Sequence, residues 1–498
     1  MNYQSTRNRQ ICVSSSQAIA EGICSDGGLF VPESFPTVSL SWLAALEPLD
    51  YRSRAEKVLS LYLTDFTPEE IRECVAGAYA GGKFSGSTPA PVVTLQSGVS
   101  FLELWHGPTC AFKDMALQLL PHLLTHALQK IHCGKDALIL VATSGDTGKA
   151  ALEGFRDVPH TRILVFYPQN GVSTMQERQM LTQEGKNVSV AAVQGNFDDT
   201  QTGVKKLFAD AELCRKIGEF GCLFSSANSI NWGRLLPQIV YYFSAWCDLV
   251  SAGRIKPGEC VNFCVPTGNF GNILAAYYAK KMGLPIKRLI CASNANNVLT
   301  QFLETGVYDR NRRFFKTISP SMDILVSSNL ERLLFDLPYG DGGRVSAWMK
   351  QLTETGCYQV DGDMLEKIRH IFSAGFCSDG ETKEEIGRIW REEHYLCDPH
   401  TAVASRVCRE YRSKTGDRTP TVIVSTASPY KFAPDVLSAI APEESTGGVF
   451  EAARRLSVLT GTPVPKPIAG LENKPVRFSR VCTKEKMTAA VLDAARKG

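Results

Sequence analysis

The chain has 498 residues, a length that predicts about three domains, or two large lobes with extensions. Hydrophobic residues make up 44% and charged residues 21%, so the composition excludes disordered, collagen-like and coiled-coil classes. The formal net charge is only +3. This balance argues against nucleic acid or an anionic membrane as a partner, but it leaves room for a local basic pocket that binds one small anionic substrate.

The sixteen cysteines are scattered along the chain and form no C-x-x-C pair. We expect free thiols in a reducing compartment and no bound metal. The N-terminus lacks the apolar core of a secretory signal, and the longest apolar stretch, 235–247, is shorter than a membrane span. These features predict a cytoplasmic protein.

The first 90 residues differ from the rest and predict an N-terminal extension domain. Helices are expected over 41–46 and 68–78, followed by a linker rich in glycine and proline near 81–91. A further helix is expected over 115–123.

From about residue 137, a short apolar run, a glycine-rich or polar turn and a helical pattern repeat along the chain. This order, with runs that are apolar throughout, predicts parallel α/β structure with strands buried on both faces. Strands are expected over 137–142, 162–167, 187–193, 260–265, 287–292 and 421–425. Helices are expected over 176–181 and 273–281, and a last one near 486–497.

This pattern divides the remainder of the chain into two parts. Residues 91–433 are expected to form two catalytic lobes, with the smaller lobe at about 137–230. Residues 434–498 are expected to form a C-terminal extension packed on those lobes.

Lys113 is the first candidate for chemistry. It follows a Gly-Pro turn, is preceded by Ala111 and Phe112, and stands at the start of a predicted helix. A lysine in apolar surroundings loses its proton more easily and can form a Schiff base with a carbonyl cofactor. A solvated lysine at a helix start is the alternative for this segment taken alone.

The turn TSGDTG at 143–148 joins a strand to a helix and is rich in hydroxyls. It is not a Walker loop, because Thr143 and Ala150 occupy positions that need glycine and serine or threonine. Its geometry suits a carboxylate or phosphate, and a simple capped turn is an equal alternative. The strand 421–425 also leads into hydroxyls, at 425–428, that could meet a ring nitrogen.

The turn PTGNFGN at 266–272 has glycines that let backbone N–H groups approach an anion at a helix start. The turn does not fit the dinucleotide-binding pattern G-x-G-x-x-G. A turn that serves only tight packing is the weaker alternative to anion binding. The polar cluster 225–234 ends in Arg234, which suits a second phosphate or a surface position. The turn 398–401 is interpreted as a helix cap without chemistry.

A candidate Schiff-base lysine, two anion-binding turns and a hydroxyl at a strand end together indicate a pyridoxal phosphate enzyme. Several segments closely resemble motifs of the threonine synthase family: HGPT at 106–109, AFKD at 111–114, TSGDTG at 143–148, GNFG at 268–271 and STA at 425–427. The N-terminal STR at 5–7 and DGGLFVP at 26–32 do so too, as does DPHTAV at 398–403. The resemblance covers nearly the whole chain and includes the long form's N-terminal extension.

The resemblance implies a fold type II pyridoxal-phosphate enzyme with two parallel-sheet α/β lobes and an N-terminal extension domain. It implies a carbon-oxygen lyase acting on phosphate, which converts O-phospho-L-homoserine and water to L-threonine and phosphate in the last step of threonine biosynthesis. Lys113 would be the catalytic residue that binds the cofactor, pyridoxal 5'-phosphate, together with Gly268, Asn269, Phe270, Asn272 and Thr426. The substrate would be bound by Ser144, Asp146, Thr147, Asn231 and Arg234.

One departure and two alternatives remain. Ser428 stands where the family pattern has a histidine, which puts any role of that histidine in doubt. A threonine-synthase-like phospho-lyase or a serine/threonine dehydratase would use the same site and release a 2-oxo acid. A non-enzymatic relative that only binds the cofactor is disfavoured by the retained Lys113. We expect a small-molecule substrate and a monomer or homodimer.

Overall fold

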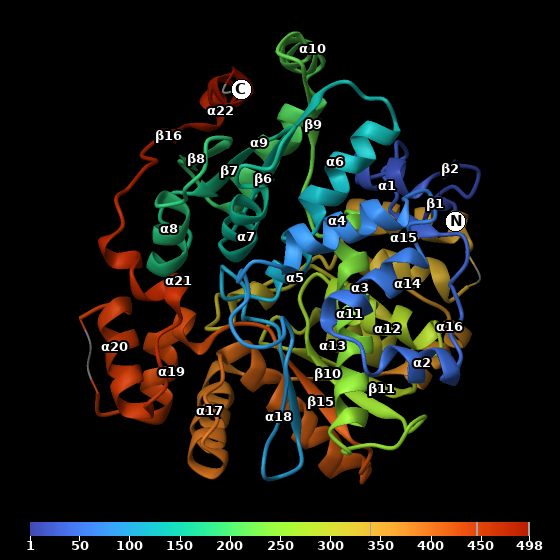
Figure 1. The fold of residues 1–498 in the computed structure, drawn as a ribbon, viewed down its shortest axis with the longest axis vertical. Helices are drawn as coiled ribbons and strands as arrows, with labels where there is room; N and C mark the ends of the chain where they lie inside the picture. The colour runs from blue at the N-terminus through green and yellow to red at the C-terminus, as the bar shows by residue number, and fades with distance from the viewer. Residues whose placement is uncertain (339, 445–446, 497–498) are drawn as a thin grey trace.

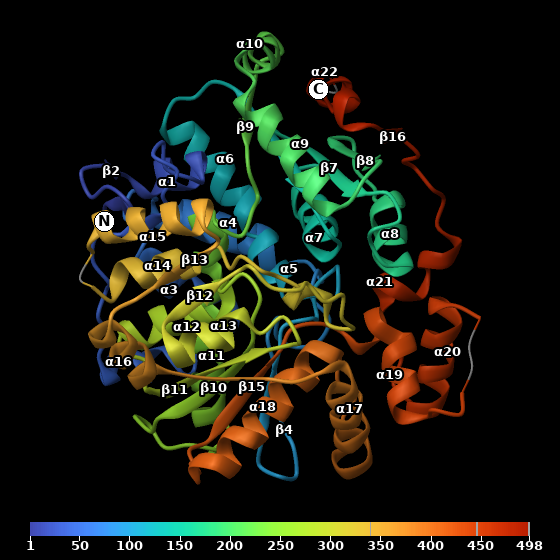
Figure 2. The same ribbon diagram turned by 180° about the vertical axis from the view of Figure 1, so that it is seen from behind.

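The computed structural model describes the whole chain except residues 339, 445–446 and 497–498. Figures 1 and 2 show two α/β lobes, an N-terminal domain packed on one side and a C-terminal segment that reaches both lobes. A sheet of mostly parallel strands lies in the middle of each lobe. The predicted fold class is therefore confirmed.

The N-terminal domain combines a small antiparallel sheet with four helices. Its strands have the order β2-β1-β3. Their bounds, with those of the helices, are β1 (Tyr3–Ser5), β2 (Cys12–Val13), β3 (Phe30–Pro32), α1 (Ser15–Glu21), α2 (Leu40–Leu46), α3 (Tyr51–Ser60) and α4 (Pro68–Tyr79). Thr67 and Glu70 form a capping box at α4, and proline takes its first position, where its missing N–H group costs no hydrogen bond. The helices expected over 41–46 and 68–78 are confirmed as α2 and α4.

The helix expected over 115–123 is two helices. The first is α5 (Lys113–Leu117) and the second is α6 (Leu120–Lys130). Pro121 lies in the first turn of α6, where its missing N–H group leaves no hydrogen bond broken. The break makes Lys113 the first residue of a short separate helix.

The large lobe contains a six-stranded sheet with the order β14-β11-β10-β15-β5-β4. All neighbours run parallel except the edge strand β4. The strands expected over 260–265, 287–292 and 421–425 are confirmed to within one residue, whereas the short strands β4, β5 and β14 were not predicted. The bounds are β4 (Val92–Thr94), β5 (Ser100–Glu103), β10 (Val261–Pro266), β11 (Ile286–Ser293), β14 (Phe372–Phe376) and β15 (Thr421–Ser425).

The longest helix of the large lobe, α11 (Trp232–Ser251), is buried over nearly its whole length and contacts α3, α5 and α12. This burial explains its almost continuous apolar sequence. The other helices are α12 (Gly271–Lys281), α13 (Val298–Thr305), α14 (Leu330–Asp336), α15 (Gly342–Glu354), α16 (Gly362–Ile371), α17 (Asp379–Glu393), α18 (Pro399–Thr415) and the short η1 (Pro320–Met322). A small hairpin joins β12 (Val307–Asp309) to β13 (Cys357–Gln359).

The smaller lobe contains a fully parallel sheet with the order β16-β8-β7-β6-β9. The strands expected over 137–142, 162–167 and 187–193 are confirmed to within one residue. The strands are β6 (Asp136–Ala142), β7 (Thr161–Pro168), β8 (Val188–Val193), β9 (Cys222–Ser225) and β16 (Val481–Cys482). The helices are α7 (Asp146–Phe155), α8 (Thr174–Leu181), α9 (Phe197–Ala209) and α10 (Ala211–Glu219).

The C-terminal segment begins on the large lobe and ends on the smaller one. Its first elements pack on α17, and the chain then passes along the smaller lobe until β16 pairs with β8. The elements are η2 (Pro429–Phe432), α19 (Ala433–Ile440), α20 (Val449–Thr460), α21 (Lys466–Ala469), η3 (Leu471–Asn473), η4 (Lys484–Lys486) and α22 (Met487–Arg496). The last predicted helix is α22, and its expected end at Lys497 lies outside the described residues.

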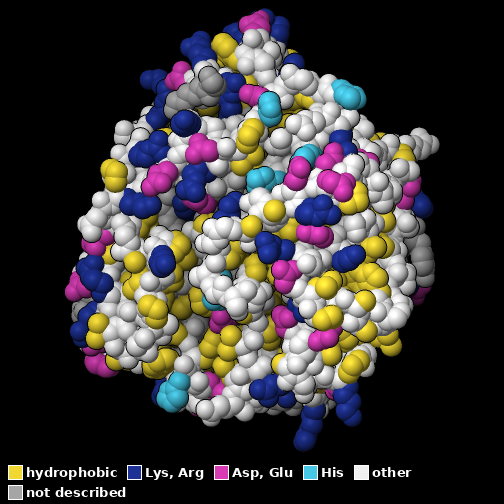
Figure 3. All heavy atoms as spheres, viewed as in Figure 1, with side chains coloured by type: hydrophobic (Ala, Val, Ile, Leu, Met, Phe, Trp, Pro, Cys, Tyr) yellow, Lys and Arg dark blue, Asp and Glu magenta, His cyan; other side chains and the backbone are white. Residues whose placement is uncertain are grey.

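Basic and acidic side chains are intermingled over the face drawn in Figure 3, in keeping with the small net charge. No helix in the part of the chain that the structure describes is long and apolar enough to span a membrane.

Candidate active site

The backbone around Lys113 is tied to the segment that follows β15. Phe112 donates its N–H to Thr426 O at 2.8 Å, and Ala111 forms an isolated antiparallel bridge with Ala427. Thr426 is buried, and its hydroxyl makes no hydrogen bond to any other described residue. The start of α5 is therefore held next to a free hydroxyl, although the two segments lie far apart in the sequence.

The Lys113 amine has little exposure to solvent and lies among polar and charged groups. Its side chain is 11% exposed, its Nζ donates to Ser321 Oγ at 3.4 Å, and Asp146 Oδ2 lies 4.0 Å away. Burial lowers the pKa of Lys113 to about 8, while Asp146 opposes the fall and the charges of Lys431 and Arg234 add to it. Part of the amine is therefore neutral near pH 7, which a nucleophile toward a carbonyl group requires.

Asp146, at the start of α7, is held from several sides. Its Oδ1 lies 2.6 Å from Lys431 Nζ and accepts from Gln176 Nε2 at 3.0 Å. Ser321 Oγ lies 3.5 Å from Oδ2. Burial would raise the pKa of Asp146, but Lys431 and Lys113 outweigh it and hold the pKa well below its usual range. Asp146 is therefore an anion in contact with two lysines.

The rest of the turn 143–148 is an internally capped βα turn. Thr143 Oγ1 accepts from the N–H groups of Gly145 at 3.0 Å and Gly148 at 2.9 Å. Ser144 is exposed and Thr147 is half-buried. The capping alternative thus describes Thr143, whereas Asp146 faces the same space as Lys113.

The turn 268–272 forms the start of α12. Phe270 has φ of +62° and provides no capping side chain, so the first N–H groups of the helix are left uncapped. A Cβ on Gly268 would lie 2.5 Å from Ser321 O, so only glycine fits there. Ser327 Oγ donates to Gly268 O at 2.8 Å, and Asn329 Nδ2 donates to Asn269 O at 3.0 Å. The carbonyl groups are thus bound on one side of the turn.

Asn272 has an amide nitrogen without a partner. Its Oδ1 accepts from the hydroxyls of Tyr241 at 2.6 Å and Tyr242 at 2.7 Å, which fixes the orientation of the amide. Its Nδ2 is buried and has no hydrogen-bond partner among the described residues. A buried donor beside uncapped helix N–H groups is a site that an anionic group would satisfy.

The two candidate residues at the start of α11, its N-cap Asn231 and Arg234 in its first turn, differ in their hydrogen bonds. Asn231 caps the helix through Gly233 N at 2.8 Å and donates to Ile19 O at 3.1 Å, so both ends of its amide have partners. Arg234 is buried and donates to Ala227 O at 2.9 Å, but its Nε has no partner and no acidic side chain pairs with it among the described residues. Burial lowers the pKa of Arg234 to about 10. Arg234 is a buried cation without a counter-ion.

Two residues of this site were not predicted. His400 is buried, its Nε2 accepts from Ser321 N at 3.1 Å, and its Nδ1 lies 2.7 Å from Asp398 Oδ1. Because Nε2 is an acceptor, the ring proton lies on Nδ1 and is donated to Asp398. The turn 398–401, interpreted as a cap only, therefore supports the loop that carries Ser321. Lys431, a lysine between Tyr430 and Phe432, was also missed.

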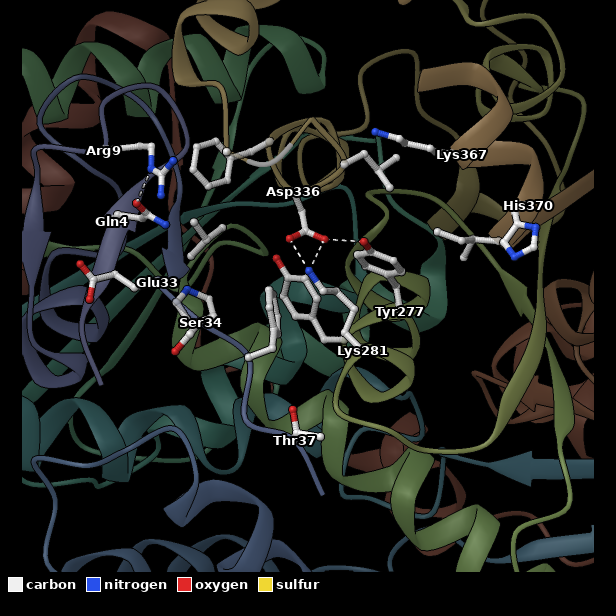
Figure 4. A pocket seen from close by; sticks show the side chains of 18 of the residues that line it. Gln4, Arg9, Glu33, Ser34, Thr37, Tyr277, Lys281, Asp336, Lys367 and His370 are labelled. Atoms are coloured by element: carbon white, nitrogen blue, oxygen red, sulfur yellow. Dashed lines mark hydrogen bonds and ion pairs between the residues drawn. The ribbon is translucent and has the colours of Figure 1, made fainter. Parts of the chain in front are cut away.

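A cavity of about 880 Å³ lies away from this cluster, at the other end of α12. Figure 4 shows Asp336 accepting from both Lys281 and Tyr277 at its centre. Lys281 Nζ also lies 4.3 Å above the ring of Phe35. The charges of Lys281 and Asp336 neutralise one another. None of the predicted site residues lines this cavity.

Comparison with known proteins gives three family matches. The model described as "Threonine synthase N terminus" matches residues 2–79, "Pyridoxal-phosphate dependent enzyme" matches 86–352, and "Threonine synthase, C-terminal" matches 401–491. A threonine synthase of Pseudomonas aeruginosa is 40% identical over 433 residues, which cover 87% of this chain and 89% of that protein.

Solved structures show the same similarity. The X-ray structure of pyridoxal-phosphate-bound threonine synthase from Brucella melitensis has a TM-score of 0.88 and 37% identity, with 100% of each chain covered.

A further sequence relative, human threonine synthase-like 1, is 44% identical over 439 residues, which cover 86% of this chain but only 58% of that protein. The chain thus spans less than two thirds of the length of this last relative.

Proposed function

This chain belongs to the threonine synthase family of pyridoxal-phosphate-dependent enzymes, and on that premise we propose that it converts O-phospho-L-homoserine and water to L-threonine and phosphate. One observation carries the proposal: a partly neutral lysine with a largely covered side chain and an uncapped helix N-terminus lie on either side of Ser321. Lys113 Nζ contacts Ser321 Oγ, and Gly268 packs against Ser321 O. A carbonyl-reactive amine and an anion site at this spacing suit a small cofactor that carries both an aldehyde and a phosphate.

The residues present fit pyridoxal phosphate. The orphaned Nδ2 of Asn272, the N–H groups of the turn from Gly268 to Phe270 and the uncapped N–H groups at the start of α12 would bind the phosphate. Lys113 would hold the cofactor covalently, and the free hydroxyl of Thr426 would bond the pyridine nitrogen. When bound, the cofactor supplies a conjugated ring that delocalises the charge left on carbon when a proton departs.

Lys113 would also move the proton at the substrate Cα. With a pKa of about 8, its amine can both accept a proton and return it near neutral pH. Ser321, held by His400, would keep the Lys113 amine in place through its hydroxyl.

The remaining candidates would bind the substrate. Arg234, a buried cation without a counter-ion, would pair with the substrate phosphate and help to exclude water from it. The hydroxyls of Ser144 and Thr147 at the start of α7 would bind the substrate carboxylate. Asp146, being an anion, would instead border the cofactor, and Asn231 would hold the first turn of α11 that carries Arg234.

Product analysis tests this proposal and separates it from the alternatives. Purified protein loaded with pyridoxal phosphate should be incubated with O-phosphohomoserine, and phosphate, threonine and 2-oxobutyrate should be measured together. We expect phosphate and threonine in equal amounts. Formation of 2-oxobutyrate in place of threonine would assign a phospho-lyase, and turnover of free serine or threonine alone would assign a dehydratase.

We also propose that the enzyme works in the cytoplasm, as a monomer or homodimer and without nucleic acid. The sixteen cysteines, none of them in a disulfide, support a reducing compartment. Cell fractionation and light scattering of the purified protein test the two statements.

A further inference from the structure

Lys431 is an unusual lysine because it is almost completely buried next to the candidate active site. Its side chain is 1% exposed, and its Nζ lies 2.6 Å from Asp146 Oδ1. The same nitrogen donates to Thr109 O at 3.1 Å, in the turn that precedes Lys113. Lys431 therefore links η2 at the start of the C-terminal segment, α7 of the smaller lobe and the turn that leads to Lys113.

The two oxygens of Asp146 have different surroundings. Oδ1 is bound closely by Lys431 and by Gln176, whereas Oδ2 has only longer contacts, 3.5 Å to Ser321 Oγ and 4.0 Å to Lys113 Nζ. An aspartate without another cation would form a close ion pair with a buried lysine at this distance. We propose that Lys431 is a positioning residue, which binds the Asp146 carboxylate and shares its charge so that Asp146 does not pair tightly with Lys113.

The charges around Lys113 agree with this proposed role of Lys431. The charged groups that influence its proton are Asp146 on α7, Lys431 on η2, Arg234 on α11 and Asp114 on α5. Lys431 and Arg234 disfavour the protonated amine, whereas the two aspartates favour it. Loss of Lys431 would both remove one opposing cation and release Asp146 toward Lys113, and each change raises the pKa of Lys113. The inference deepens the proposed function and rests on it for its catalytic meaning.

Lys149 offers a matched control. It comes from α7, as Asp146 does, its side chain is 11% exposed, and it forms a 3.1 Å ion pair with Glu153. Burial lowers its pKa, as it does for Lys113. Neither Lys149 nor Glu153 contacts Asp146, so a variant at Lys149 removes a comparable ion pair without touching the proposed one.

The experiment is a titration of Lys113 in the full chain without cofactor, by competitive acetylation across a pH series and mass spectrometry of the peptide that contains it. We expect Lys431→Met to raise the midpoint of the Lys113 titration by at least about one pH unit, which is a tenfold rise in the proton affinity of its amine. Lys431→Arg, which keeps the charge, and Lys149→Met should leave the midpoint close to that of the wild type. An unchanged midpoint in folded Lys431→Met, or an equal rise in Lys149→Met, would overturn the proposal.

If Lys431→Met does not fold, the double variant Lys431→Met/Asp146→Asn removes both charges at once. Its Lys113 midpoint should lie at or below the wild-type value, because the carboxylate that favours the protonated amine is gone. A midpoint above that value would also overturn the proposal. Since no substrate or cofactor takes part, failure of the chain to make threonine would leave this result intact, and the two failures can be told apart.

Discussion

Replacing Arg234 by methionine should separate substrate binding from stability. The side chain is buried, it makes one hydrogen bond at 2.9 Å to Ala227 O, and no described acidic group pairs with it. Burial lowers its pKa to about 10. At about 1.4 kcal/mol per pH unit, the charged form costs the protein roughly 3 kcal/mol while no anion is bound.

This cost predicts the effect on folding. Methionine keeps most of the volume and carries no charge, and the lost hydrogen bond is worth about 1 kcal/mol. We expect the free energy of unfolding of the cofactor-free protein to stay constant or rise by up to about 2 kcal/mol. By contrast, kcat/KM for O-phosphohomoserine should fall at least about 30-fold, or roughly 2 kcal/mol, because the substrate phosphate then has no cation.

The assay pairs denaturant unfolding with phosphate release, and Arg332→Met is the control. Arg332 is also fully buried, but its three nitrogens all have acceptors: Phe30 O, Asn329 Oδ1 and Ile230 O. Burial lowers the pKa of Arg332 as well, so both variants lose a buried charge, but Arg332→Met leaves three acceptors unsatisfied instead of one. Its free energy of unfolding should therefore lie at least about 2 kcal/mol below that of Arg234→Met. The reasoning is refuted if Arg234→Met keeps kcat/KM within about threefold of the wild type, or loses as much stability as Arg332→Met.

Three further outcomes follow from the geometry of the site. Borohydride reduction of the holoenzyme and peptide mapping should find the cofactor on Lys113, and a label on Lys149 would contradict the assignment. The rate at which the cofactor-free protein takes up pyridoxal phosphate should rise with pH and level off above about 8, because the neutral amine reacts; a rate independent of pH would speak against the lowered pKa of Lys113. Gly268→Ala places a Cβ 2.5 Å from Ser321 O, so the turn must move, and fluorescence titration should show at least about tenfold weaker cofactor binding. Equal affinity would show that this turn does not bind the phosphate.

The sheets could be predicted from the sequence where strands are buried on both faces. Such strands are apolar throughout, so 137–142 and 421–425 were recognised almost residue for residue as β6 and β15. The strand β14 follows directly after α16 without a turn signal, and β9 ends in the serine of a polar cluster. These short strands form because neighbouring strands offer them hydrogen bonds, which a local pattern does not reveal.

The candidate site, too, could be predicted from local sequence patterns only in part. Lys113, the turn at 268–272 and Thr426 could be found because each stands at the end of a regular element. Lys431 and His400 contact Asp146 and Ser321, which are distant in the sequence, and only the folded chain brings these pairs together. A buried lysine is costly without a partner, so a lysine within an apolar run was the one available hint.

The pairing of β16 with β8 has a consequence for biosynthesis. The first four strands of the smaller lobe are complete once residue 225 has been made, but the edge of β8 at Ala192 and Val193 stays unpaired until residues 481–482 have left the ribosome. An open, apolar edge strand is a template for wrong pairing with other chains. Contacts of such high sequence separation also form slowly. Between the synthesis of residue 225 and that of residue 481, the nascent lobe that contributes Asp146 is therefore exposed to aggregation, and chaperone demand should concentrate on it during that interval.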